Sequence, residues 1–175
     1  MWRLCADVKE TKLAAIALGS NMGDSLATLR QAARDLAGLG EITARSSLYQ
    51  TDPVGGPEGQ NVFLNAVILL KSNEKLLDPE QLLDALLALE QKHGRERRVR
   101  WGPRTLDLDL LLMGAQVWNS ERLTLPHPRM MERPFVLAPL CEVWPKLKHL
   151  ESGQTVCEIL AKMDMSGVIR TNLSW

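Results

Sequence analysis

The stretch that decides the fold covers residues 104–113 and reads Arg-Thr-Leu-Asp-Leu-Asp-Leu-Leu-Leu-Met. Side chains alternate between the two faces of a strand, so Asp107 and Asp109 share one face while Leu106, Leu108 and Leu110 share the other. Two carboxylates on a core face would be costly unless a cation compensated them. The stretch therefore predicts a strand, at 106–113, with one apolar face toward a core and one open acidic face.

Apolar segments earlier in the chain predict three more strands and two helices. The strands are expected at 13–18, 42–49 and 63–70. One helix follows Asp24, a candidate N-cap, and the other follows Asp78, with Pro79 at its first position. The order β-α-β-β-α-β predicts an α+β fold. We expect a two-layer sandwich with a ferredoxin-like core, in which both helices pack on one face of an antiparallel sheet.

Length and composition indicate one domain at residues 13–175, preceded by a short extension at 1–12. The chain has 175 residues, of which 45% are hydrophobic and 24% charged, which is typical of a globular protein. Beyond residue 123 we expect additional short strands and helices, with helical pieces near 136–142 and 155–163.

Charge and hydrophobicity limit the partners that the chain is expected to have. Its 21 basic and 21 acidic residues give a net charge of zero, so no global field draws it to nucleic acid or to a membrane. No apolar run approaches the roughly 18 residues of a membrane span, and residues 1–12 lack the apolar stretch of a signal peptide. We therefore expect a cytoplasmic protein, and a monomer, since no self-complementary apolar surface can be recognised.

The cysteines predict no structural role. Cys5, Cys141 and Cys157 are odd in number, lie far apart and form no Cys-x-x-Cys pair. Neither a zinc site nor a disulfide framework is indicated, and reduced thiols are expected.

The acidic pair suggests a metal site. Mg²⁺ is typically held by one or two carboxylates together with waters and substrate phosphates, and Asp107 and Asp109 on an open face offer such oxygens. A solvated strand face is the alternative, because an Asp-x-Asp pair by itself is a weak signal.

An arginine-rich loop directly before the acidic strand strengthens the metal hypothesis. Between Gly94 and Arg104 the chain has five arginines against one acid, a local excess of +4. Arginine grips phosphate oxygens in a bidentate manner, and a neighbouring cation completes the requirements of phosphoryl transfer. Trp101 adds a flat aromatic wall. A solvated basic loop or an RNA-contacting patch is the alternative reading.

Two further segments carry candidate binding residues. Phe63 and Asn65 share one face of a predicted strand, where the ring could stack on a heterocycle and the amide could pair with its edge. His127 lies in the rigid stretch Leu125-Pro126-His127-Pro128, where it could donate to a phosphate, although a lone histidine is more often structural. The sequence lacks the glycine-rich motifs of the common nucleotide-binding folds.

Taken together, these segments resemble the 6-hydroxymethyl-7,8-dihydropterin pyrophosphokinases of folate biosynthesis. The resemblance extends from about residue 13 to at least 145. It rests on the segments 17–24, 49–55, 63–66, 90–95, 100–109 and 125–128, of which Arg-Trp-Gly-Pro-Arg-Thr-Leu-Asp-Leu-Asp at 100–109 is the most specific. It implies transfer of the β,γ-diphosphate of ATP to the hydroxymethyl oxygen of the pterin, with AMP as the other product.

The resemblance also implies roles for particular residues. Two Mg²⁺ ions would be held by Asp107 and Asp109. The residues implied in catalysis are Arg95, Arg104, Asp107 and Asp109. Those implied on the ATP side are Glu90, Arg97, Trp101, Arg104, Leu110, Arg122, Thr124, His127 and Arg133. Those implied around the pterin are Thr51, Pro53, Val54, Phe63, Asn65, Trp101 and Phe135.

Three rival functions remain open at this point. A ferredoxin-like RNA-binding module would use the arginine loop, and its RNA affinity would depend on salt but not on Mg²⁺. An ordinary kinase would move only the γ-phosphate and leave ADP. A regulatory domain would bind pterin or nucleotide without turnover.

Overall fold

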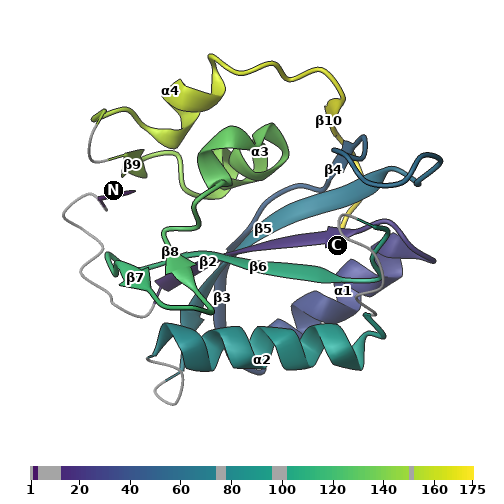
Figure 1. Cartoon of the computed structure of the whole chain (residues 1–175), viewed down its shortest axis with the longest axis horizontal. Helices are drawn as coiled ribbons and strands as arrows, with labels where there is room; N and C mark the ends of the chain where they lie inside the picture. The colour runs from purple at the N-terminus through teal and green to yellow at the C-terminus, as the bar shows by residue number, and fades with distance from the viewer. Residues whose placement is uncertain (1, 4–12, 74–77, 96–101, 150–151) are drawn as a thin grey trace.

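The computed structural model describes residues 2–3, 13–73, 78–95, 102–149 and 152–175. Figure 1 shows a central sheet with helices on both faces. The strands are β1 (Trp2–Arg3), β2 (Leu13–Ser20), β3 (Gly40–Arg45), β4 (Tyr49–Thr51), β5 (Phe63–Ser72), β6 (Asp107–Met113), β7 (Trp118–Asn119), β8 (Thr124–Leu125), β9 (Lys148–His149) and β10 (Val168–Arg170). The helices are α1 (Ser25–Leu36), α2 (Pro79–Lys92), the short 3-10 turn η1 (Met130–Glu132), α3 (Pro134–Val143) and α4 (Val156–Leu160).

The main sheet confirms the expected β-α-β-β-α-β core. Its strand order is β10-β4-β5-β2-β6, β3 also pairs with β5, and every pairing is antiparallel. Helices α1 and α2 lie on one face of the sheet, as Figure 1 shows. Leu106, Leu108 and Leu110 are buried against these helices, so the side-chain alternation predicted for β6 is correct.

Both predicted helix starts are confirmed. Asp24 caps α1 by accepting a hydrogen bond from the backbone N–H of Ala27, 2.9 Å away. Asp78 caps α2 by accepting from the backbone N–H of Glu80 at 2.8 Å, and Pro79 occupies the first helical position. Such side chains satisfy backbone donors that have no partner within the helix.

The prediction of one continuous strand at 42–49 is wrong, because the chain leaves the sheet at residues 46–48. The backbone N–H of Ser46 donates to Val67 O, and its hydroxyl accepts from Val67 N–H, each at 3.0 Å. Leu48 turns into the core and is fully buried. The chain then returns to β5 as β4. The hydrophobic periodicity of the sequence does not show this kink. At residues 46–48 the burial of Leu48 and the side-chain hydrogen bond of Ser46 replace the regular backbone hydrogen bonds between strands.

Helix α3 covers part of the second face of the sheet. Its residues Val136, Leu137 and Leu140 are buried in a cluster with Val67 of β5 and Leu111 of β6. Helix α4 packs against α3 on the side away from the sheet (Figure 1). The predicted helical pieces near 136–142 and 155–163 correspond to these two helices.

The expectation of reduced thiols is wrong for two of the three cysteines. Cys141 of α3 and Cys157 of α4 form a disulfide, with their Cα atoms 5.1 Å apart. The packing of α3 on α4 brings the two residues together, and their separation of 16 positions in the sequence gave no sign of it. Cys5 lies outside the described residues.

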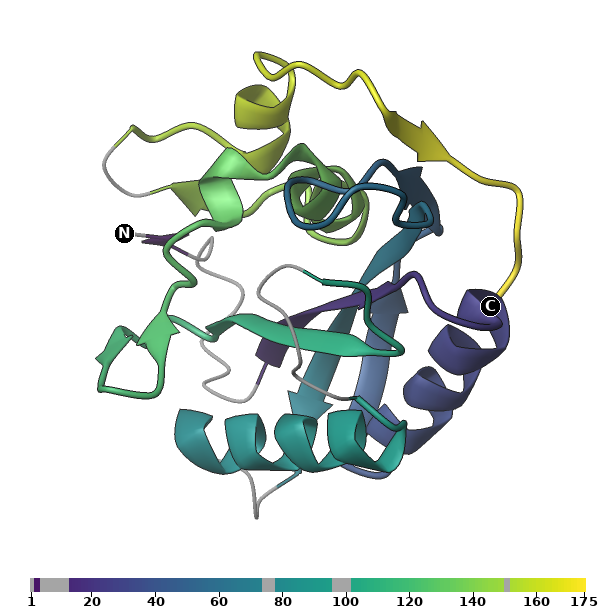
Figure 2. The same ribbon diagram turned by 45° about the vertical axis from the view of Figure 1, so that its right-hand side comes forward.

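The C-terminal segment returns to the first helix. After β10, the chain runs along the edge of the sheet and ends beside α1, as Figure 2 shows. The Arg30 guanidinium of α1 donates to the backbone oxygen of Ser174 at 2.7 Å, and the Trp175 indole donates to Ser46 O at 2.8 Å. Among the described residues, no helix is long and apolar enough to cross a membrane.

An ion-pair cluster joins the ends of α1 and α2. Asp35 accepts from Lys92 Nζ at 3.0 Å and lies 2.8 Å from His93 Nε2. Burial works against ionisation of Asp35, but hydrogen bonds from Lys92, His93 and Gln31 outweigh it and lower its pKa from 3.8 to about 2. The ionised carboxylate therefore stabilises the folded state.

We expect Asp35→Asn to lower the free energy of unfolding by about 1–2 kcal/mol at pH 7. A lowered pKa contributes stability above the unfolded-state value of roughly 4, and this contribution disappears as the pH falls toward 2. Urea unfolding of both proteins at pH 7 and pH 3 measures the difference, and Glu41→Gln, which alters an exposed carboxylate, is the control. An equal loss at both pH values would contradict the assignment.

Candidate active site

The floor of the site is built by three neighbouring strands. Register pairs Asn65 of β5 with Gly19 of β2, and Gly19 with Asp107 of β6. In the next row of this face, Ala17 of β2 pairs with Asp109 of β6. The central strand therefore contributes only glycine and alanine between the amide and the two carboxylates. These small residues leave space above the sheet, on the face opposite α1 and α2.

Gly19 lies in close contact with a neighbouring side chain. A Cβ atom added to it would lie 3.0 Å from Asn65 Oδ1. The side chain of Asn65 thus lies over the glycine, where a larger residue would push it aside.

A cavity of about 380 Å³ lies over this floor. Helix α3 and the turn before it form one wall, and the loop after β4 forms the other. The lining includes nine of the site residues that the sequence analysis predicted, namely Thr51, Val54, Phe63, Asn65, Arg104, Asp107, Asp109, Arg133 and Phe135. The volume and the mixture of aromatic and charged walls are typical of a small-molecule site.

Asp107 carries two arginine partners. Arg95 Nη1 lies 2.5 Å from Asp107 Oδ1, and Arg104 Nη1 donates to Asp107 Oδ2. Arg95 follows the end of α2 and Arg104 lies just before β6, so two segments bring guanidinium groups to one carboxylate. Arginine guanidinium groups bind phosphate oxygens through charge-assisted hydrogen bonds of the same kind as those to carboxylates.

Asp109 lies two residues further along β6 on the same face. Arg133 Nη1 is 3.5 Å from its Oδ2. Desolvation by the surrounding walls raises the pKa of Asp109, and repulsion from Asp107 raises it further, while His127 and Arg133 oppose the shift. A carboxylate whose ionised form is disfavoured by desolvation and by a neighbouring carboxylate favours a bound cation.

Glu90 lies beneath the site rather than in it. It is 2% exposed, and its Oε1 accepts from the backbone N–H of Leu108 at 2.8 Å. The same oxygen pairs with Arg95. Glu90 thus joins Arg95 to the strand residue between the two aspartates. Its expected contact with ATP stays a prediction.

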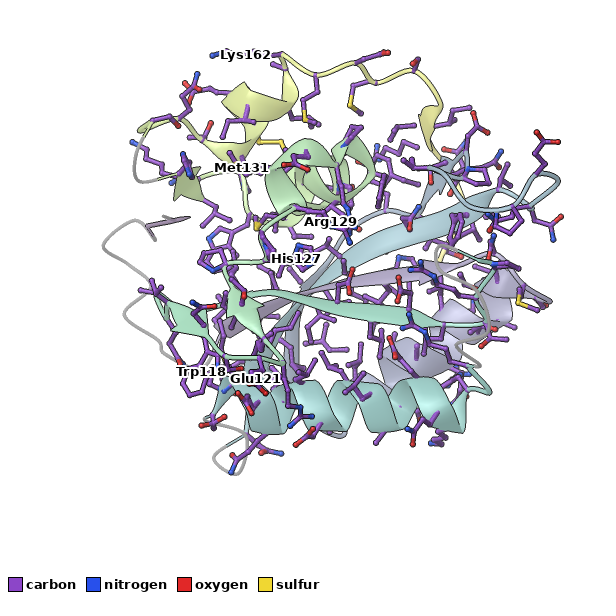
Figure 3. All side chains as sticks on the ribbon, viewed as in Figure 1. Trp118, Glu121, His127, Arg129, Met131 and Lys162 are labelled. Atoms are coloured by element: carbon purple, nitrogen blue, oxygen red, sulfur yellow. A yellow bond between two sulfur atoms is a disulfide. The ribbon has the colours of Figure 1, made fainter. Side chains whose placement is uncertain are left out.

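His127 lies on the segment between β8 and α3, where Figure 3 labels it beside Arg129. Its backbone N–H donates to Leu111 O at 2.7 Å, which ties this segment to β6. Burial lowers the pKa of His127, the charge of Asp109 raises it, and the charges of Arg133 and Arg129 lower it. The histidine is therefore within electrostatic reach of the acidic pair.

The other end of the cavity is suited to a flat polar ring. Asn65 Nδ2 donates to Thr51 Oγ1 at 2.7 Å, and both side chains are buried. Phe63 of β5 and Phe135 of α3 line the cavity, and the guanidinium of Arg133 lies 5.8 Å from the centroid of the Phe135 ring. An amide and a hydroxyl beside aromatic walls can pair with a ring edge and stack on its faces.

Several expected residues lie away from this cavity lining. Arg122 pairs with Glu80 and Asp84 of α2, and Thr124 bonds to Asn119 within the β7–β8 hairpin. The Leu110 side chain is buried in the core, and Pro53 lies in the loop between two lining residues. Arg97 and Trp101 lie outside the described residues. The roles expected for these six remain predictions.

The lining also includes residues that the sequence reasoning missed. Arg129 directly precedes η1, Glu132 is the last residue of η1, and Asp52 follows β4. Arg129 and Glu132 lie between His127 and Arg133 in the sequence. Their position between two expected site residues was the only sign in the sequence that pointed to them. Nothing in the sequence distinguished Asp52 from the other polar residues of its loop.

The residues of β6 fit divalent metal ions held jointly with a ligand. Among the described residues there is no group of three or more histidine, cysteine or acidic side chains placed to bind a metal alone. Asp107 and Asp109 provide two carboxylates on one strand face, and Mg²⁺ often takes one or two such ligands plus substrate phosphates. The donor set thus matches a cation that arrives with phosphate.

An acidic pair flanked by arginines, beside a ring-sized cavity on a ferredoxin-like sheet, defines the class: a phosphoryl-transfer enzyme that acts on a flat substrate. The model of the 7,8-dihydro-6-hydroxymethylpterin-pyrophosphokinase family matches residues 15–145. The chain belongs to this family, and it is an ATP-dependent diphosphokinase of folate biosynthesis.

Relatives from several bacteria support the assignment. Each is named a 2-amino-4-hydroxy-6-hydroxymethyldihydropteridine pyrophosphokinase. The protein from Bacillus subtilis is 47% identical over 82% of this chain and 85% of its own length. The Methylorubrum extorquens protein is 45% identical over 89% and 96%, and the Synechocystis protein 40% identical over 89% and 78%.

Solved structures confirm the fold. The wild-type HPPK-DHPS of Plasmodium falciparum with SDX-DHP superposes with a TM-score of 0.66 over 90% of this chain, at 15% identity. Its A437G variant with pteroate gives 0.65 over 86% at the same identity. The chain spans less than half of those proteins, 47% and 42% of their lengths.

Proposed function

We propose that the cavity transfers the β,γ-diphosphate of ATP to the hydroxymethyl oxygen of 6-hydroxymethyl-7,8-dihydropterin, which yields the pterin diphosphate and AMP. The observation that carries this proposal is the placement of Asp107 and Asp109 beside three arginines on the β6 side of a cavity whose β5 side is lined by Asn65 and Phe63. The phosphates would then lie on the β6 side and the ring on the β5 side.

Charge neutralisation and positioning provide most of the catalysis in this proposal. Arg95 and Arg104 already converge on Asp107, and Arg133 approaches Asp109. The same guanidinium groups would grip phosphate oxygens and stabilise the charge that develops during transfer. No strong general base is required, since an in-line arrangement of hydroxyl and phosphorus accounts for a large rate effect. Asp107 would accept the hydroxyl proton.

Asp107 and Asp109 would hold two Mg²⁺ ions together with the phosphates of ATP. Bound there, the ions would supply positive charge that neutralises the phosphates. They would also compensate the desolvation and the repulsion from Asp107 that raise the pKa of Asp109. The nearby His127 would face the phosphate side.

On the ring side, the pterin would lie between Phe135 and the Phe63 end of the cavity. Asn65 and Thr51 would pair with its edge, and Val54, which is 73% exposed, would approach it from the loop after β4. The 13–175 domain boundary, a monomeric state, a cytoplasmic location and the absence of nucleic-acid and membrane partners remain predictions that accompany this proposal.

Identification of the nucleotide product tests the proposal. The protein is incubated with Mg-ATP and hydroxymethyldihydropterin, and the nucleotides are separated by chromatography. We expect AMP to accumulate in equal amount to the pterin diphosphate. ADP would show an ordinary kinase, and an absence of turnover would favour a binding domain. RNA affinity that depends on salt but not on Mg²⁺ would support the RNA-binding alternative.

A further inference from the structure

Asn21, in the turn directly after β2, lies at the junction of two segments that build the site. It is 2% exposed, although the two residues that follow it in the turn, Met22 and Gly23, are exposed. A buried amide must find partners for its polar atoms, or it costs folding free energy. The identity of those partners shows what the residue holds together.

One set of hydrogen bonds leads to the phosphate side. The backbone N–H of Arg104 donates to Asn21 Oδ1 at 2.7 Å, and the backbone N–H of Asn21 donates to Arg104 O at 3.0 Å. Both polar groups of the Arg104 backbone are therefore fixed by one residue. The guanidinium of Arg104 extends from this fixed point to Asp107.

A second set leads to the ring side. Asn21 Nδ2 donates to Asn61 O at 3.1 Å and to Gln60 Oε1 at 3.4 Å, and Asn61 Nδ2 donates to Asn21 O at 3.3 Å. Asn61 closes the long loop after β4 and lies two residues before Phe63 of β5. This end of the loop is thereby held against the end of β2.

The chemistry of the amide explains why asparagine suits the position. One end of its side chain accepts from a backbone N–H and the other donates to a backbone carbonyl. Aspartate offers no donor, and alanine offers neither group. We propose that Asn21 is a positioning residue that fixes the Arg104 backbone and the Asn61 end of the loop relative to each other. It thereby sets the spacing between the phosphate and ring ends of the cavity. This inference rests on the proposed function for the roles of the two ends.

Two substitutions distinguish the contact of Asn21 with Arg104 from its contact with Asn61. Asn21→Ala removes both side-chain contacts, and we expect its kcat to fall about 100-fold, because a displacement of roughly 1 Å at a reacting group can cost that much. Asn21→Asp keeps the acceptor for Arg104 N–H but sets an oxygen against Asn61 O. Its KM for the pterin should rise about tenfold, while its kcat stays within about threefold of wild type.

Ser46→Ala is the matched control. Ser46 is also buried and hydrogen-bonded to a neighbouring strand, but its partner Val67 does not line the cavity, whereas Arg104, the partner of Asn21, does. Amide exchange of Arg104, followed by NMR, gives a readout that is independent of activity. Exchange should accelerate at least tenfold in Asn21→Ala and stay slow in Asn21→Asp.

Equal kinetic losses in Asn21→Ala and Ser46→Ala, at similar melting temperatures, would overturn the inference. So would identical kcat and KM changes in the two Asn21 variants. If Asn21→Ala does not fold, Asn21→Asp and the exchange of Arg104 decide the matter. A wild-type protein that forms no AMP would instead refute the proposed function.

Discussion

Replacing Asp109 by alanine is expected to lower Mg²⁺-dependent turnover by about a thousandfold or more. Metal-assisted charge stabilisation is worth several kcal/mol, and each 1.36 kcal/mol changes the rate tenfold. The fold should survive, because among the described residues the Asp109 side chain forms no hydrogen bond to another element, and its ion pair with Arg133 is 3.5 Å long. Steady-state assays of purified Asp109→Ala measure the effect.

The stability of this variant gives an independent check. The pKa of Asp109 is raised, so its ionised form costs folding free energy at neutral pH. We therefore expect the melting temperature of Asp109→Ala to equal or exceed that of the wild type. Asp164→Ala, which removes an exposed acid from the C-terminal segment, is the matched control and should retain full turnover. Near-normal turnover of Asp109→Ala would refute the role of the acidic pair.

Substitution of either arginine on Asp107 should have the second large effect. In other phosphoryl-transfer enzymes an arginine at such a site is worth roughly 10³–10⁵ in rate. We expect Arg95→Ala and Arg104→Ala to lose turnover on that scale, while the KM values change by about tenfold or less. Arg45→Ala, at the exposed end of β3 and outside the cavity lining, is the control.

The two arginine variants should differ in stability. Arg95 also neutralises Glu90, whose side chain is only 3% exposed, and loss of one partner from a buried pair costs about 3 kcal/mol or more. Within the part of the chain that the structure describes, Arg104 forms an ion pair only with Asp107. Arg95→Ala should therefore melt at a clearly lower temperature than Arg104→Ala. Unchanged turnover in either variant would remove that arginine from the proposed mechanism.

The sequence was most informative about features that depend on a single strand or a single helix end. The alternation of Leu108 and Asp109 correctly predicted the core face and the open face of β6. Asp24 and Asp78 marked two helix starts because capping depends on neighbouring residues only. The resemblance of residues 100–109 to a known family pointed to Arg104, Asp107 and Asp109, which line one cavity in the structure.

Features that depend on distant packing could not be predicted in this way. The disulfide between Cys141 and Cys157 requires the packing of α3 on α4. The position of Arg122 depends on acids of α2, and no local pattern shows that pairing. Asn21 looked like an ordinary turn residue, since its partners Asn61 and Arg104 are 40 and 83 positions away.

The number of metal ions bound with nucleotide tests the central claim most directly. Mn²⁺ replaces Mg²⁺ and is counted by electron paramagnetic resonance in the presence of a non-hydrolysable ATP analogue. The account predicts two ions per wild-type chain, with at least one lost in Asp109→Ala and both retained in Asp164→Ala. Two ions bound equally well by Asp109→Ala would contradict the assignment of the β6 aspartates as the metal site.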